Sequence, residues 1–291
     1  MHSMHGQAAG SALLEREVVV TGVDTDSSSA CPMNPAELLA ELREMNRTYR
    51  DNQNAWLRLN NQELAIVRRE LDCSKGEAVK ILKEILKGAP KPETVSVVSS
   101  LTIVSRCRPF EAAKVPLLVE QKRARSYLEK EILRLPVSII EWVRGTRGLG
   151  LFIFSQIIAE TGDLSGYSTP SKLWKRLGLA VIDGERQRKH RDKLKALESG
   201  YSPRRRALMW NVGECLIKLN RDGAYKAAYD ARKTHEQQVN EAGGHERTPI
   251  HIHRRAKRFM EKLLLKDLWV VWRAAWPERS SVAGSTTQQD Q

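Results

Sequence analysis

The sequence predicts an all-α protein, with a helix-hairpin-helix domain preceded by long helices of coiled-coil character. Two observations support this class. Apolar residues recur at helical spacing through most of the chain, and several of these segments open on a capping signal such as Asn-Pro or Ser-Pro. Only one run of the expected folded region, 95–104, is rich in β-branched residues, and one such run does not build a sheet.

The length of 291 residues allows one large or two modest domains with a real core. The polar, Ser-rich segment 1–34 predicts a disordered tail, and so does 277–291. Between them we expect a helical segment with a linker at 35–108 and the helix-hairpin-helix domain at 109–276.

The first long helix begins at Asn34-Pro35, with Asn as the cap and Pro at the first helical position, and runs to about Leu71. Its larger side chains follow a 4-3-4-3 rhythm typical of a coiled coil. Two alternatives follow: a homo-oligomer through 35–72, in which Asn52 sets the register, or packing inside the same chain. The seam consists of Leu38, Leu42, Met45, Tyr49, Asn52, Trp56, Leu59 and Ile66.

A capping box at Ser74 and Glu77 predicts a short helix that ends near Gly88, followed by a break at 89–92. The β-branched run 95–104 predicts an isolated strand or an extended linker. A second long helix is then expected from Pro116 to Leu135, because Pro136 ends it.

Two glycines, Gly148 and Gly150, lie between the apolar-periodic runs 139–143 and 153–158. This pattern predicts two helices joined by a glycine turn that allows positive φ and a close backbone approach. The free N–H groups of the second helix would then form a seat for a phosphate. The alternative is a turn between two buried helices that binds nothing.

Further along, Gly178 closes a short helix at 171–177, and the charged segment 183–200 predicts a mobile basic loop. Ser202-Pro203 opens a helix over 204–219. A last helix at 249–276 should present its apolar side chains inward, namely Ala256, Phe259, Leu263, Leu268 and Val271.

The positive charge is concentrated in the second half of the chain. The formal net charge is +13, and 141–276 holds 27 Lys and Arg against 15 Asp and Glu, a net of +12. A polyanion is the expected partner, with DNA first and structured RNA second, rather than a membrane. The candidate DNA-binding residues are Gly148, Gly150, Lys172, Lys175, Arg176, Arg186, Arg188, Lys189, Arg191, Arg204, Arg205 and Arg206.

Other chemistry is weakly signalled. The four cysteines are far apart and fit a reducing compartment without a zinc site. His251 and His253 are two residues apart and lack a companion ligand, so no metal site and no cofactor are expected. No secretion signal or 18-residue apolar stretch is seen, and we expect a soluble cytoplasmic, nucleoid-associated prokaryotic protein. Ser202 before Pro favours an N-cap over a nucleophile.

Gly148-Leu-Gly-Leu, Ala159-Glu-Thr-Gly-Asp163, Tyr167, Lys172-Leu173 and Gly178-Leu179 together carry a resemblance. The segment 148–179 resembles, without gaps, the C-terminal serine domain of bridge-RNA-guided insertion-element transposases. Those proteins pair this domain with a RuvC-like domain that bears four metal-binding acids. The weaker part of the resemblance extends over about 116–276.

The resemblance implies a protein of DNA transposition or recombination that binds DNA at a junction. Val20–Asp24 is similar to the family's first strand, but a long helix follows instead of a β-meander. Mg²⁺ is therefore implied only if an acidic site exists elsewhere. Whether the chain is an enzyme stays open, with Ser199 and Ser202 the candidates for the family's nucleophile. The alternatives are a DNA-binding protein, an active serine recombinase, and an RNA-binding scaffold.

Overall fold

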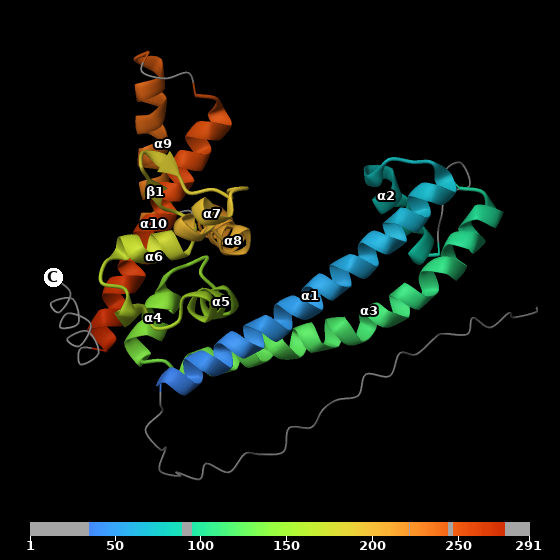
Figure 1. Ribbon diagram of the computed structural model, residues 1–291, viewed down its shortest axis with the longest axis horizontal. Helices are drawn as coiled ribbons and strands as arrows, with labels where there is room; N and C mark the ends of the chain where they lie inside the picture. The colour runs from blue at the N-terminus through green and yellow to red at the C-terminus, as the bar shows by residue number, and fades with distance from the viewer. Residues whose placement is uncertain (1–34, 89–94, 221, 244–246, 277–291) are drawn as a thin grey trace, which may run out of the picture. The chain divides into compact units, whose positions relative to one another are not determined.

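Helices account for nearly all of the regular structure, which confirms the all-α class (Figure 1). The computed structural model describes residues 35–88, 95–220, 222–243 and 247–276. The α-helices are α1 (Pro35–Leu71), α2 (Lys75–Leu86), α3 (Val97–Glu131), α4 (Val137–Gly145), α5 (Leu151–Thr161), α6 (Pro170–Arg176), α7 (Lys193–Ser199), α8 (Pro203–Leu219), α9 (Ala224–Glu241) and α10 (Pro249–Ala275). Short elements are η1 (Ile132–Arg134), η2 (Leu164–Gly166), β1 (Val181–Ile182) and β2 (Glu185–Arg186).

Helices α1 and α3 lie side by side over much of their length (Figure 1). Leu38 and Leu42 of the predicted seam are fully buried, as are Ile103 and Leu128 of α3. The seam therefore packs inside the chain, which was one of the two alternatives. Asn52 donates a hydrogen bond of 3.0 Å to the Thr48 carbonyl of its own helix, and a homo-oligomer stays a prediction.

The expected strand or linker at 95–104 is wrong, because α3 already begins at Val97. Ser96 caps it by accepting the N–H of Ser99 at 3.1 Å. Pro116, expected to start the helix, lies inside it together with Pro109. A proline inside a helix costs about 3 kcal/mol, and the packing of α3 along α1 offsets that cost. The expected domain boundary at 108/109 falls within this helix.

The predicted capping box of α2 is confirmed. The Ser74 N–H donates to a Glu77 carboxylate oxygen at 2.9 Å, and the Glu77 N–H donates to Ser74 Oγ at 3.3 Å. Helix α2 covers one end of the α1–α3 pair with a small apolar core that includes Leu82 and Ile85. The Asn34 cap, the break at 89–92 and both expected tails lie outside the described residues.

Helix α10 organises the remaining helices, because it contacts α4, α6, α8, α9 and η2. Ala256 and Leu268 are fully buried, as predicted, whereas Phe259 is 44% exposed and was wrongly placed inward. Leu263 and Val271 are half-buried. The inward face instead includes Met260, Leu264, Leu265 and Trp272.

The segment 183–200, expected as a mobile loop, instead contains β2 and α7, and only 187–192 lies between them without a helix or strand. β1 and β2 form an antiparallel pair around Asp183 and Gly184, whose φ angles of 50° and 78° suit a tight two-residue turn. Helix α7 follows and ends at Gly200, in the left-handed region with φ 58°. Helix α9 was not anticipated.

Within the described ranges, no helix is long and apolar enough to cross a membrane.

Candidate functional site

The glycine turn between α4 and α5 confirms the predicted helical hairpin. Gly148 has φ of 96°, and a Cβ there would lie 2.9 Å from the carbonyl oxygen of Cys215 on α8. The close backbone approach that Gly148 allows is therefore an approach to α8 of the same protein. Gly150 has φ of −73° and serves as the N-cap of α5. A phosphate seat on the first turn of α5 remains a prediction.

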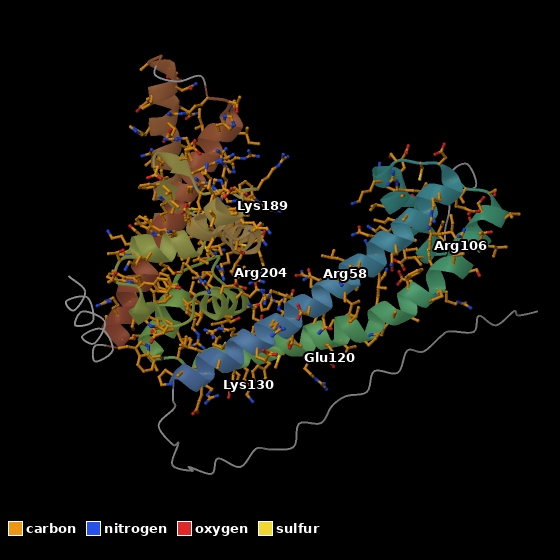
Figure 2. The ribbon with its side chains drawn as sticks, in the orientation of Figure 1. Arg58, Arg106, Glu120, Lys130, Lys189 and Arg204 are labelled. Atoms are coloured by element: carbon orange, nitrogen blue, oxygen red, sulfur yellow. The ribbon has the colours of Figure 1, made fainter. Side chains whose placement is uncertain are left out.

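The predicted DNA-binding bases have three different environments. The side chains of Lys172, Lys175, Lys189 and Arg191 are exposed, and Figure 2 marks Lys189 between β2 and α7. Arg188 forms an ion pair of 3.0 Å with exposed Glu185, which is worth little. The others, Arg176, Arg186, Arg204, Arg205 and Arg206, line pockets or bind buried carboxylates.

The three arginines that open α8 contact carboxylates of their own chain. Arg204 and Arg205 lie 2.9 and 3.2 Å from one Glu160 oxygen, and Arg206 lies 2.9 Å from Glu261. Both glutamates are nearly or fully buried. Only the Arg204 side chain is more than half exposed, at 54%. These arginines therefore hold α8 to α5 and α10, besides any contact with a ligand.

The buried Glu160 lines a small polar cavity of about 240 Å³, which we call the arginine cup. Three helices that are distant in sequence supply its cations. Arg50 of α1 lies 2.9 Å from Glu160, and the Nε of Arg176 donates to the Glu160 carbonyl at 3.1 Å. The cup is lined by Arg43, Glu44, Asn46, Arg47, Arg50, Ala159, Glu160, Arg176, Arg204 and Arg205.

The cup carries an excess of positive charge, with six arginines against two glutamates, a net of +4. Burial by itself raises the pKa of Glu160, but the hydrogen bonds and charges of Arg204, Arg50 and Arg205 outweigh it and hold that pKa below its ordinary value. Burial and the charge of Arg204 lower the pKa of Arg50. The cup therefore keeps Glu160 ionised while its cations repel one another.

A larger cavity of about 470 Å³, which we call the basic pocket, lies among the β-hairpin, α9 and α10. Seven of its residues are cations and one is an acid, a net of +6. Phe259 and Val181 add exposed apolar surface. It is lined by Val181, Gly184, Arg186, Arg232, Glu236, Arg247, His251, Arg254, Arg255, Arg258, Phe259 and Lys262.

The single acid of the basic pocket, Glu236, is shared by three arginines. Arg247 and Arg255 lie 2.7 and 2.6 Å from one of its oxygens, and Arg232 binds the other. Burial raises the pKa of Glu236, and the hydrogen bonds from Arg255 and Arg232 more than reverse this effect. This carboxylate organises the pocket without neutralising it.

The other cations of the pocket have no carboxylate within ion-pair distance among the described residues. Burial first, and the charge of Arg206 second, lower the pKa of Arg258. Burial and the charge of Arg258 likewise lower the pKa of Lys262. The Nε of Arg258 is buried and has no hydrogen-bond partner in the described part of the chain. A buried donor without an acceptor costs about 1–3 kcal/mol.

Both candidate nucleophiles have structural roles. Ser202 is the N-cap of α8, and its Oγ accepts the N–H of Arg205 at 3.4 Å, as its position before Pro predicts. Ser199 is 6% exposed, and its Oγ is directed to the Arg188 carbonyl at 3.5 Å.

The histidines do not gather ligands. His253 Nδ1 lies 2.7 Å from the hydroxyl of Tyr229, while His251 lines the basic pocket. No group of three His, Cys, Asp or Glu side chains in the described residues is arranged to hold a metal ion.

Of the residues that line the basic pocket, sequence reasoning named only Arg186 as a DNA-binding residue, because it overlooked α9 and treated α10 chiefly as a core helix. One signal was present: Tyr225, Tyr229 and Glu236, all buried, recur at helical spacing. It also missed Arg43, Arg47 and Arg50, which α1 carries into the cup. No protein family, no curated protein and no solved structure matches this chain.

Proposed function

We propose that this protein binds the phosphate backbone of DNA and that the basic pocket is the centre of its DNA-binding surface. The observation that carries the proposal is the seven-to-one ratio of cations to acids in that pocket, with the buried Arg258 Nε left without an acceptor. Phosphate oxygens are strong acceptors for guanidinium groups, and such contacts bind without reading sequence.

Neighbouring residues extend this surface. Arg186 joins the pocket to the hairpin turn, and Lys189 and Arg191 are exposed just beyond β2. Phe259 offers an apolar face beside the cations, a combination common where nucleic acids are bound. The resemblance of 148–179 to insertion-element transposases supports a role in DNA recombination. The capping role of Ser202 and the burial of Ser199 favour DNA binding over serine catalysis.

The test is a salt titration of binding to duplex DNA, a four-way junction and structured RNA. The variant Arg186→Ala/Arg254→Ala removes two exposed cations of the pocket. Because each phosphate contact contributes about 0.9 to the salt slope, the slope for duplex DNA should fall by about 1.8.

The matched control is Lys122→Ala/Arg123→Ala, which removes the same charge from the exposed surface of α3. Its slope should remain that of the unchanged protein. If both double variants lose affinity equally, binding follows net charge alone and the pocket is not the site. If structured RNA binds more tightly than both duplex DNA and the four-way junction, the partner is RNA and not DNA.

A further inference from the structure

The arginine cup is distinct from the basic pocket, with no lining residue in common. Its walls come from α1, α5, α6 and α8, and nine of its ten lining residues are polar or charged, Ala159 being the exception. Apart from Ala159, no apolar side chain lines it. The net charge of +4 selects an anion.

The cup itself is small, and four of its lining residues, Asn46, Arg50, Glu160 and Arg204, also border a neighbouring cavity of about 610 Å³. The cup's own volume of about 240 Å³ is below the roughly 300–1,000 Å³ typical of pockets for whole small molecules. A single oxyanion with several acceptor oxygens suits such a space. Guanidinium groups bind phosphate with two parallel hydrogen bonds each, so converging arginines favour a phosphate over a halide.

Three of the six arginines are already engaged, because Arg50, Arg204 and Arg205 contact the Glu160 carboxylate. The other three are available to a ligand. Arg43 has no carboxylate within ion-pair distance in the described ranges. Its guanidinium lies against Gly162, where an added Cβ would be 3.2 Å from Nη2.

Arg47 and Arg176, the remaining available arginines, have only weak partners among the described residues. Arg47 has a loose contact of 3.7 Å with Asp51, and both side chains are about two-thirds exposed. An exposed pair of this kind is worth at most about 1 kcal/mol. Arg176 contacts only a backbone oxygen among the described residues.

We propose that the arginine cup binds one phosphate group through Arg43, Arg47 and Arg176, beside the buried Glu160. The phosphate is either a terminal phosphate of a DNA strand or free inorganic phosphate. Only the first source rests on the proposed DNA binding. Since Arg43 and Arg47 belong to α1 and Arg176 to α6, the ligand bridges the first helix to the basic half of the chain and stabilises the folded protein.

The first arm of the test uses inorganic phosphate and the full chain. Calorimetric titration should show saturable phosphate binding that chloride at equal ionic strength does not reproduce, and the melting temperature should rise with phosphate concentration. Arg43→Gln should weaken phosphate binding about tenfold or more. The control is Arg58→Gln, an exposed arginine on the same helix outside the cup, marked in Figure 2.

Two results would overturn the proposal: phosphate that acts no differently from chloride, or an equal loss of phosphate binding in Arg43→Gln and Arg58→Gln. The second arm compares duplexes with a 5′-phosphate or a 5′-hydroxyl. Tighter binding of the phosphorylated duplex, lost in Arg43→Gln, identifies a strand end as the source. Equal binding of the two duplexes, together with saturable binding of free phosphate, identifies inorganic phosphate.

The two proposals fail separately. Arg186→Ala/Arg254→Ala should still bind inorganic phosphate. If the protein binds inorganic phosphate but no duplex DNA, the proposal for the arginine cup stands and the proposed DNA binding is refuted.

Discussion

Replacing Gly148 by Ala tests whether this glycine serves the fold or a ligand. Its φ of 96° lies in the region that L-residues rarely adopt, which costs about 1–2 kcal/mol. The added Cβ would meet three backbone atoms of α8, the carbonyl oxygen and carbon of Cys215 at 2.9 and 3.2 Å and the Cα of Leu216 at 3.3 Å. Backbone atoms of a packed helix cannot rotate away, and overpacking of this kind costs about 1–3 kcal/mol.

We therefore expect Gly148→Ala to lower the free energy of unfolding by about 2–5 kcal/mol. For a protein of this size, each kcal/mol corresponds to roughly 2–4 °C in melting temperature. The assay is thermal unfolding followed by circular dichroism, supported by denaturant titration. The control is Gly145→Ala on α4, where a Cβ has no neighbour within 4 Å and φ is not positive, so the melting temperature should stay the same or rise slightly.

An unchanged melting temperature in Gly148→Ala, accompanied by weaker DNA binding, would refute this reasoning. It would mean that the space at Gly148 is needed by a phosphate, as the glycine pattern alone suggests. If Gly148→Ala loses stability but the folded variant keeps its DNA affinity, the role of Gly148 is structural.

Three further predictions concern single side chains. Burial raises the pKa of Glu261 to about 7 from an ordinary 4.5, so between these values the native state holds a proton that the unfolded chain has lost. The free energy of unfolding should therefore fall as pH rises through that window, and Glu261→Gln should flatten the fall; an unchanged pH profile would contradict this. Ser202→Ala should lower stability by about 1 kcal/mol and Ser202→Thr by less, with DNA affinity intact, whereas loss of strand transfer at full stability would make Ser202 a nucleophile. Glu236→Gln should destabilise the free protein by about 1.5–3 kcal/mol, because three partly exposed arginines lose hydrogen bonds to their shared carboxylate, yet tighten DNA binding as the pocket gains positive charge. Weaker DNA binding in that variant, at a temperature where it is folded, would argue against the basic pocket.

Local signals were sufficient for much of the secondary structure. The first helix, the capping box at Ser74 and the turn at Gly148 follow from residues close together in sequence, because caps and turns depend on a few neighbouring backbone groups. The concentration of positive charge after Glu141 is likewise a property of the sequence, and it motivates a polyanionic partner before any fold is known.

Where local preference and packing disagreed, packing prevailed. Pro116 signals a helix start, yet α3 continues through it because its apolar side chains have α1 to pack against. The segment 183–200 looks like a solvated loop, but Asp183-Gly184 turns it into a hairpin beside α10.

Tertiary structure alone decided which charges meet. Glu160 belongs to the Ala159–Asp163 motif, but the motif does not identify its arginine partners, which are 44, 45 and 110 residues away. Arg247 and Arg255 likewise reach Glu236 only when α9 folds back along α10, whereas Arg232 is one turn away on α9 itself. The sequence by itself therefore determined the helical class and the sign of the charge. The positions of the cup and the pocket arise from long-range packing, since electrostatic interactions depend on distances that the order of residues does not specify.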